Sequence, residues 1–303
     1  MTRDVVQVSA AAYPARPRPQ TRASWRRRVL VLTGLVLIAG LGVEAYQWWT
    51  RPRPTPPSEI FRGVTYTCFE PREPECRGLV HVVKVDLTAP GIQLYLTPLD
   101  AGAMVHGYQY RLDTAPAVLE REHLAVVVNA AYFSSDSAVL QWSGDWARGV
   151  QTIVADGQVS DLDPHSYMLW FESDLTPHLE FEKPPTEAIL RRARWAVGGG
   201  AIPLWKGKLR EAAASHEMDR RTAVAIDSQR KLLWLAVFEN ASSLAVAKIL
   251  AEQGAQDGFL LDGGHSTTMV LGSQAAAGVQ TGSLIHGWRP VATFFGIRAK
   301  SLH

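Results

Sequence analysis

The stretch GFLLDGGHSTTMV, residues 258–270, carries the strongest signal of fold in the sequence. Its apolar beginning has the composition of a buried strand, and that strand ends at Asp262. Gly263 and Gly264 then permit a tight turn, because a residue without a Cβ adopts backbone conformations that others avoid. The turn brings a carboxylate, the His265 imidazole and several hydroxyl groups together. We predict a polar site at the end of a strand, with an ordinary polar β-turn as the alternative.

The flanking segments predict short strands with a few helices between them. Residues 243–255, SLAVAKILAEQGA, have helical periodicity and end in a glycine suited to a C-cap. RTAVAID and KLLWLAVFE, residues 221–227 and 231–239, predict a hairpin. TIVADGQV, residues 152–159, predicts a second hairpin around its Asp-Gly pair.

Further strands are predicted nearer the N-terminus. Residues 81–98 contain HVVKVDL and GIQLYLTP, which we expect to pair around a Pro-Gly turn. LAVVVNAAYF, residues 124–133, predicts a buried strand that ends near Asn129. Strands outnumber helices, and no repeat of solenoid length is present. We therefore predict an α+β fold, with a mixed central sheet and interspersed helices.

The N-terminal residues predict export to the cell envelope. Residues 29–43 carry no charge, and the apolar stretch continues to Trp49, close to the roughly 20 residues that a spanning helix needs. Arg26–Arg28 precede it, which places the N-terminus in the cytoplasm and the chain after Trp49 outside. A cleaved signal peptide is the alternative, because Val43 and Ala45 have the spacing of a cleavage site.

We predict four segments along the chain. Residues 1–28 are a disordered basic cytoplasmic tail, and residues 29–49 are one N-terminal transmembrane helix that anchors the protein. Residues 50–60 are an extended proline-rich linker. Residues 61–303 have the length of one folded domain.

Composition excludes wholesale disorder and argues against nucleic-acid binding. The 303 residues are 47% hydrophobic and 20% charged, which suits one sizeable core. The formal net charge is only +2, and much of the basic excess precedes residue 29, so no polyanion-binding face is predicted. Cys68 and Cys76 are separated by a short polar run and would close a disulfide loop in an oxidising compartment, with a free pair as the alternative.

Several segments together resemble the phosphodiester glycosidase family. DGGHSTTM resembles its Asp-Gly-Gly-x-Ser-Thr signature, VVVNAAYF its strand ending in Asn-Ala/Gly-x-Phe, and AVGGGAIPLWKGKL its glycine pair. DRRTAVAID resembles its Pro-Arg-Thr-Ala strand at Arg221 and Thr222. GWRPVATFFGI resembles its Glu-Arg-Pro-Val-Ala-Asn segment at Arg289 and Pro290. These matches follow one another in order over about residues 81–297.

The resemblance implies hydrolysis of a sugar joined through its anomeric carbon to a phosphodiester, which releases the sugar and leaves a phosphomonoester. Such cleavage needs a carboxylate near the anomeric carbon and a cation near the phosphate. For catalysis we expect Asp262 as nucleophile or general base, Glu239 as a second carboxylate and Arg221 as the phosphate clamp, with a structural salt bridge as the alternative for Arg221. Asn129 would bind a sugar hydroxyl or orient Asp262, unless it is a plain strand-end cap. His265 would shuttle a proton.

The same resemblance assigns a second set of residues to substrate binding: Gly263, Gly264, Ser266, Thr267, Gly199 and Arg289. Asp262 and Glu239 with backbone oxygens would suit a calcium ion, but no EF-hand or HExxH spacing is present. The identity of any cofactor or metal therefore stays open.

We expect a membrane-anchored, envelope-exposed hydrolase that acts in exopolysaccharide or cell-envelope glycan metabolism, with its domain periplasmic or extracellular. Its partners would be a sugar-phosphate or envelope glycan substrate and the membrane itself. A non-catalytic polysaccharide-binding or scaffold protein is the alternative, because FENASS, residues 238–243, replaces the family's common Asp-Gly-Arg. A third hypothesis is an esterase with Ser266 as nucleophile and His265 as base.

Overall fold

The computed structural model describes most of the chain after Arg51. The described residues are 25, 28–36, 38–40, 42, 52–135, 141–161, 163, 167–181, 185–201, 203–211, 214–276, 278–285 and 289–302. The chain divides into two compact units, Met1–Arg51 and Pro52–His303.

In the first unit, the described residues 25, 28–36, 38–40 and 42 are helical. No helix in the described part of the chain is long and apolar enough to cross a membrane. The remaining positions of the predicted anchor, including residues 43–49, and residues 1–24 of the predicted tail lie outside the described residues.

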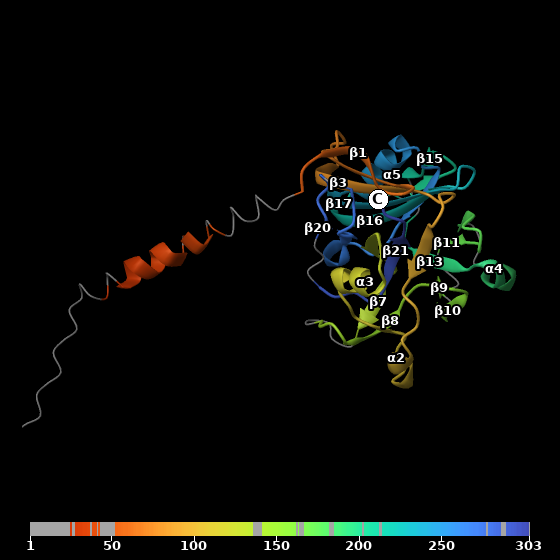
Figure 1. Ribbon diagram of the computed structural model, residues 1–303, viewed down its shortest axis with the longest axis horizontal. Helices are drawn as coiled ribbons and strands as arrows, with labels where there is room; N and C mark the ends of the chain where they lie inside the picture. Colours follow the sequence, from red (N-terminus) through yellow and green to blue (C-terminus); the bar gives the residue numbers. More distant parts are fainter. Residues whose placement is uncertain are drawn as a thin grey trace, which may run out of the picture. The chain divides into compact units, whose positions relative to one another are not determined.

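The described strands of the second unit form four sheets (Figure 1). The largest has eight strands, in the spatial order β1 (Thr55–Phe61), β2 (Val64–Phe69), β3 (Cys76–Asp86), β17 (Leu232–Ala241), β16 (Asp219–Asp227), β18 (Asp257–Leu260), β14 (Leu204–Trp205) and β15 (Lys208–Leu209). A five-stranded sheet has the order β20 (Gly282–Ile285), β19 (Met269–Leu271), β6 (Val126–Asn129), β21 (Phe294–Arg298) and β4 (Gln93–Leu96).

Two smaller assemblies complete the strands. The second five-stranded sheet has the order β10 (Gln158–Asp161), β9 (Ile153–Ala155), β13 (Trp195–Gly199), β11 (Tyr167–Phe171) and β12 (Pro177–Glu180). The three-stranded sheet has the order β5 (Tyr110–Arg111), β8 (Trp146–Gly149) and β7 (Phe133–Ser135). The helices of this unit that the structure describes are α2 (Ala101–Val105), α3 (Ala115–Arg121), α4 (Glu187–Arg192), α5 (Ser243–Glu252) and the 3-10 turn η2 (Gly264–Ser266).

The prediction of a strand-rich α+β fold is confirmed, but the single mixed central sheet is replaced by several antiparallel ones. Every strand pairing among the described residues is antiparallel. The short connections between successive strands, such as the hairpin of β16 and β17, favour this arrangement, since a parallel pair needs a long crossover.

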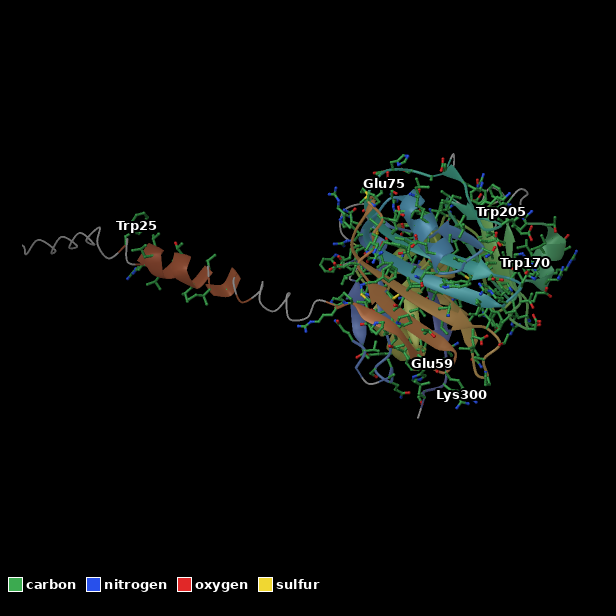
Figure 2. The ribbon with its side chains drawn as sticks, turned by 90° about the horizontal axis from the view of Figure 1, so that it is seen from above. Trp25, Glu59, Glu75, Trp170, Trp205 and Lys300 are labelled. Carbon is green, nitrogen blue, oxygen red and sulfur yellow. The ribbon has the colours of Figure 1, made fainter. Side chains whose placement is uncertain are left out.

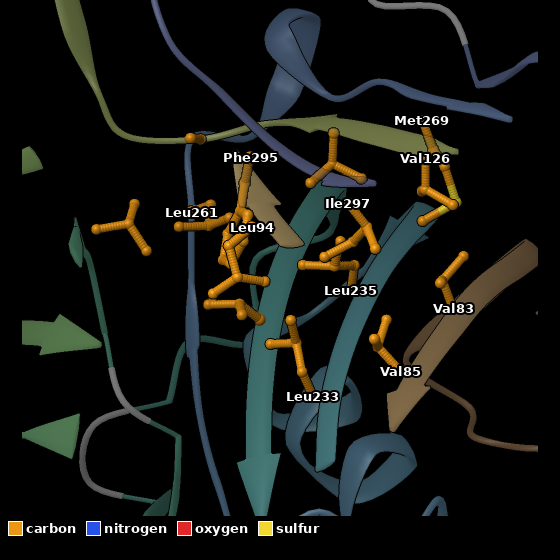
Figure 3. Packing of buried hydrophobic residues seen from close by; sticks show 14 of the residues in the cluster. Val83, Val85, Leu94, Val126, Leu233, Leu235, Leu261, Met269, Phe295 and Ile297 are labelled. Atoms are coloured by element: carbon orange, nitrogen blue, oxygen red, sulfur yellow. The ribbon is translucent and has the colours of Figure 1, made fainter. Parts of the chain in front are cut away.

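The main core lies between the eight-stranded sheet and the sheet that contains β6. Val83 of β3 and Leu235 of β17 pack in one cluster with Val126 of β6 and Ile297 of β21 (Figure 3). Alternate residues of β17, such as Trp234, face the other way and pack against α5. The large sheet is therefore covered on both faces, by a second sheet and by a helix.

The hairpin and helix predictions close to the signature are confirmed. Strands β16 and β17 pair from Asp219 to Asp227, and β9 pairs with β10 around a turn in which Asp156 and Gly157 both have positive φ. Helix α5 begins after Ser242, whose hydroxyl accepts a hydrogen bond from the Ala245 N–H at 3.1 Å.

The predicted hairpin over residues 81–98 is wrong. Strand β3 pairs with β2 and β17 in the large sheet, whereas β4 pairs with β21 in the five-stranded sheet. The Pro-Gly turn therefore leads the chain from one sheet of the core to the other. Strand β3 pairs with its neighbour β2 and with the remote β17, and the partner of β4 is the remote β21.

The predicted linker over residues 50–60 is also corrected. Thr55–Phe61 is β1, an edge strand paired with β2, and its register is irregular between Thr55 and Ser58, where the two prolines lie. Prolines are tolerated there because an edge strand has N–H groups with no ladder partner. The C-terminal segment lies beside the end of β1: the Arg62 N–H donates to the Lys300 carbonyl at 2.9 Å, and Figure 2 shows Glu59 and Lys300 on the same side of the molecule.

The predicted disulfide is wrong, because Cys68 and Cys76 are both free and buried. Cys68 on β2 lies opposite His81 on β3. Cys76 precedes His81 on the same strand by a distance on the order of 16 Å, at about 3.3 Å per residue. A disulfide needs Cα atoms within about 7 Å. The two side chains also lie in clusters on opposite faces of the sheet. Burial raises the pKa of Cys68 to about 11 and that of Cys76 to about 12, so both remain thiols.

A buried histidine makes the stability of this core depend on pH. His81 is 0% exposed, its Nδ1 shares a 2.8 Å hydrogen bond with the Tyr66 hydroxyl, and burial lowers its pKa from 6.5 to about 4. The unfolded chain takes up this proton at a higher pH than the folded protein does. The free energy of unfolding should therefore fall as pH drops through about 6.5 towards 4, by about 3 kcal/mol from this group.

Denaturant unfolding at pH 7 and pH 4.5 measures this effect. His81→Gln keeps an acceptor for Tyr66 and should flatten the pH dependence. His123→Asn is the control, because His123 is exposed and its positive φ of 52 suits asparagine, and it should leave the slope unchanged. A full slope in the His81 variant would contradict the assignment.

Candidate active site

The signature turn lies where the chain passes from the large sheet to the sheet containing β6. Strand β18 pairs with β16, and η2 then leads into β19, which pairs with β6. Between them, the Leu261 N–H donates to the Thr222 carbonyl at 2.9 Å, and the Asp262 N–H donates to the Ala130 carbonyl at 2.9 Å. The ends of β6, β16 and β18 therefore meet at Asp262.

Asn129 holds these three ends together. Its Nδ2 donates to the Asp262 carbonyl at 2.6 Å, and its Oδ1 accepts from the Thr222 hydroxyl at 2.7 Å and from the Thr268 N–H at 3.0 Å. The side chain is 1% exposed. Of the roles predicted for Asn129, the geometry favours the orientation of Asp262, through its backbone.

The two glycines of the signature are needed for different reasons. A Cβ on Gly263 would lie 2.9 Å from the Arg220 carbonyl oxygen, so only glycine allows β16 to approach this closely. Gly264 has φ +59, a conformation that favours glycine. The Gly263 N–H lies near the Asp262 carboxylate and favours its charged form.

The Asp262 carboxylate lies near a pair of bonded polar groups. Arg289 donates to the Ser266 hydroxyl oxygen from Nη2 at 2.7 Å and from Nε at 3.2 Å, and both residues lie close enough to Asp262 to favour its charged form. Burial raises the pKa of Asp262 above its usual range, and the Ser266 hydrogen bond and the Arg289 charge oppose that rise. Asp262 is therefore a base of increased strength, and its backbone is anchored by Asn129 and Ala130.

Arg221 borders the signature turn at Gly263. Its Cδ would be 3.9 Å from a Cβ on Gly263, its Nη2 donates to the Glu217 carbonyl at 2.8 Å, and its Nε donates to the Ala241 carbonyl at 3.2 Å. Among the residues that the structure describes, no carboxylate forms an ion pair with Arg221 within 4.0 Å. The structural salt bridge is therefore absent from the described residues, and a fixed guanidinium retains donors for an anion.

FENASS, the segment that differs from the family pattern, supports the fold around Arg221. Its Ala241 carbonyl accepts the Arg221 bond, and its Ser242 hydroxyl caps α5. Of this segment, Ser242 therefore has a side-chain role in the fold.

Two residues that we did not predict also border the site. Tyr132 lies close enough to Asp262 and Arg221 for both charges to act on its hydroxyl. An Asp219 carboxylate oxygen lies 3.3 Å from the position of a Cβ on Gly264. Tyr132 was contained in the matched strand segment, but nothing in the pattern distinguished it from a packing residue.

Other predicted residues are placed apart from Asp262 or are explained by packing. Glu239 lies on β17, and its Oε2 accepts from the Leu79 N–H of β3 at 3.0 Å. Asp262 follows β18, and β16 lies between β17 and β18, which are therefore two strand spacings apart, roughly 10 Å. The structure therefore does not bring the expected pair of carboxylates together. A Cβ on Gly199 would overlap the Phe259 ring at 1.8 Å, so Gly199 is required for packing.

The remaining signature residues differ in exposure. His265 is exposed on η2. Thr267 is buried, and its hydroxyl has no hydrogen-bond partner among the described residues. Neither observation shows contact with a substrate.

The possible calcium site has no support from Asp262 and Glu239, because the two side chains do not converge. The described residues contain no group of three or more His, Cys, Asp or Glu side chains that could hold a metal ion. A cavity of about 530 Å³ lies elsewhere, lined by Tyr95, Trp195 and their neighbours, so polar convergence rather than cavity size locates the candidate site.

These features define a strand-rich protein in which a strand-end carboxylate lies beside arginines. The chain belongs to the phosphodiester glycosidase family, whose model matches residues 122–298, more than half of the chain. This confirms the family resemblance. Strands β1 to β5 precede the matched region but belong to the same compact unit.

Solved structures support the same fold. The catalytic domain of zebrafish N-acetylglucosamine-1-phosphodiester alpha-N-acetylglucosaminidase, described as auto-inhibited by pro-peptide, is similar with a TM-score of 0.56 and 16% identity, over 83% of this chain and 87% of that chain. A hypothetical protein from Synechocystis is similar with a TM-score of 0.52 and 14% identity, over 78% of this chain and 62% of that chain. No curated protein sequence matches the chain.

Proposed function

We propose that this protein hydrolyses the bond between the anomeric carbon of a sugar and the phosphate of a phosphodiester. The observation that carries the proposal is that the Asp262 carboxylate and the Arg221 side chain both border the signature turn and that both charges act on the Tyr132 hydroxyl. A carboxylate suits the developing positive charge on the sugar, and a guanidinium suits the phosphate that leaves.

In the proposed reaction, Asp262 acts as general base or nucleophile. As a base, it accepts a proton from water while the water oxygen forms a bond to the anomeric carbon. The bond from that carbon to the phosphate oxygen breaks, and its electron pair leaves with the phosphomonoester. Burial favours this role, because a raised pKa makes the Asp262 carboxylate a stronger base.

Arg221 would bind two oxygens of the phosphate. The two backbone carbonyls that accept from Nε and Nη2 fix the plane of the guanidinium before substrate arrives. A phosphate leaves readily without protonation, so the reaction does not depend on a second carboxylate such as Glu239. The substrate we propose is a sugar-1-phosphodiester of an exopolysaccharide or another envelope glycan.

We also propose that the domain is exported and anchored. Support comes from the uncharged residues 29–43 that follow Arg26–Arg28. Protease treatment of intact and lysed cells tests the location, because an exported domain is cleaved in cells whose inner compartment is intact.

The activity test uses the purified full-length protein with a synthetic N-acetylglucosamine-1-phosphate diester and measures free sugar. The wild type should release sugar, and Arg221→Ala should lower kcat/KM by about 10²–10³-fold. Arg221→Lys should recover part of that loss, since lysine restores the charge but not the two-pronged geometry. Arg191→Ala is the control, because its side chain is 70% exposed on α4.

Absence of release from diesters of several sugars, with and without added calcium, would refute the proposed activity. Release that is insensitive to Arg221→Ala would retain the activity but remove the role assigned to Arg221.

A further inference from the structure

Tyr132 is positioned by hydrogen bonds of its backbone and by the packing of its hydroxyl. Its carbonyl accepts from the Val150 N–H at 3.0 Å, and its N–H donates to Gln151 Oε1 at 3.4 Å. At the other end, the hydroxyl would lie 3.2 Å from a Cβ on Gly200, whose own N–H donates to the Leu260 carbonyl at 2.8 Å. The phenol therefore reaches from the end of β6 to the end of β18, two residues before Asp262.

The charges that act on the Tyr132 hydroxyl come from Asp262, which is assigned to the sugar, and from Arg221, which is assigned to the phosphate. Burial is the main reason that the pKa of Tyr132 is raised; the Asp262 charge adds to the rise, and the Arg221 charge opposes it. The phenol therefore stays protonated at neutral pH and is a hydrogen-bond donor. A raised pKa does not favour a phenolate nucleophile.

Position then suggests which atom the hydroxyl contacts. The Asp262 N–H donates to the Ala130 carbonyl, two residues before Tyr132, and the Tyr132 hydroxyl lies beside Gly200, whose N–H donates to Leu260, so the hydroxyl and Asp262 share one strand end. With Asp262 assigned to the anomeric carbon and Arg221 to the phosphate, we place the hydroxyl at the oxygen that joins them. Negative charge develops on that oxygen as its bond to the anomeric carbon breaks. A donor placed there stabilises the transition state more than the bound substrate.

We propose that Tyr132 is a further catalytic residue, whose hydroxyl donates a hydrogen bond to the oxygen between sugar and phosphate, and that Gly200 leaves the space this hydroxyl needs. This inference rests on the proposed phosphodiester glycosidase activity. No proton is transferred in this step: the phenol keeps its proton, and the phosphate leaves with the electron pair.

Tyr132→Phe removes only the hydroxyl and is the first test. We expect kcat for the sugar-1-phosphate diester to fall about 10²-fold, with KM changed by less than about twofold. The acid limb of the pH profile, which depends on Asp262, should stay in place. Tyr167→Phe is the matched control, since Tyr167 lies in β11 and packs against Phe181, and it should keep the wild-type kcat.

Gly200→Ala provides a second test through the same hydroxyl. The added Cβ would meet the hydroxyl at 3.2 Å but the nearest ring carbon at 3.5 Å, an ordinary contact, so it should displace the oxygen and leave the ring in place. We expect kcat to fall about tenfold in the wild type. In the Tyr132→Phe background the same substitution should have no further effect, because the displaced atom is absent.

The outcomes separate the two proposals. If the wild type turns over and Tyr132→Phe matches it, the role of Tyr132 is refuted and the glycosidase activity stands. The same holds if Gly200→Ala has an equal effect with and without the hydroxyl. If the wild type releases no sugar, both proposals fail.

Discussion

Asp262→Asn is expected to lower kcat by about 10²–10⁴-fold without a loss of stability. The amide keeps the size and shape of the side chain but can neither accept the proton of water nor attack the sugar. Burial raises the pKa of Asp262, so the charged form is unfavourable in the folded state at neutral pH. Removing that charge should leave the free energy of unfolding at pH 7 equal or higher, as measured in denaturant.

The pH profile of the wild type tests the same assignment. A base works only when it is deprotonated, and burial raises the pKa of Asp262 above that of an ordinary aspartate. Activity should therefore fall on the acid side at a higher pH than an unperturbed aspartate would give. An acid limb at the pH of an ordinary aspartate would contradict the role of a buried base.

Asp219→Asn is the matched control, because its carboxylate borders the same turn but is exposed. It should retain most of the activity. A larger loss of kcat from Asp219→Asn than from Asp262→Asn would reverse the assignment.

Asn129→Ala is expected to lower both stability and activity. The Thr222 hydroxyl, the Thr268 N–H and the Asp262 carbonyl would each lose a buried partner. An unsatisfied buried group costs about 1–3 kcal/mol, and partial relaxation should leave a total loss of about 3 kcal/mol in the free energy of unfolding. Because Asp262 loses its anchor, kcat should also fall, by up to about 10²-fold for a displacement near 1 Å.

Two controls separate the network from general damage to the core. Thr222→Val removes one donor to Asn129 and should cost about 1 kcal/mol. Thr293→Val removes a 3.0 Å bond from the Thr293 hydroxyl to the Ala131 carbonyl, close to the same strand but outside the network, and should cost about as much with little change in kcat. Equal losses of kcat in Asn129→Ala and Thr293→Val would contradict the orienting role.

Local sequence chemistry predicted the parts of the fold whose partners are close along the chain. The Asp-Gly turn between β9 and β10, the hairpin of β16 and β17 and the capped helix α5 all depend on adjacent residues. The position of Asp262 at the end of a buried strand was predictable for the same reason. The family signature adds Arg221 and Asn129, which the structure does bring to this strand end.

The errors for the hairpin and for Glu239 concern features that remote partners decide, whereas the error for the disulfide concerns strand alternation. The Pro-Gly turn after β3 looked like a hairpin, but both flanking strands find better-matched partners in different sheets. Cys68 and Cys76 are close in sequence, yet strand alternation sends them to opposite faces. The direction of the Glu239 side chain depends on β3, which joins β17 from more than 140 residues earlier.

Tyr132 is a site residue that the sequence did not identify. An aromatic residue beside a buried strand is usually a packing residue, and its sequence context gives no sign of Gly200 or Asp262. Only the close approach of β13 and β18, which requires small residues such as Gly199, reveals that its hydroxyl reaches a charged site.

The irregular register and the prolines of β1 also affect whether two chains can pair edge to edge. An edge strand with unpaired backbone groups is a template for another chain, and prolines with a broken register make β1 a poor one. A chain shortened to begin at Phe61 would lose this cover and turn β2, whose inner-facing residues are apolar, into the new edge. Self-association of shortened chains would then reflect the uncovered sheet, and the folded unit is better taken from Pro52 onward.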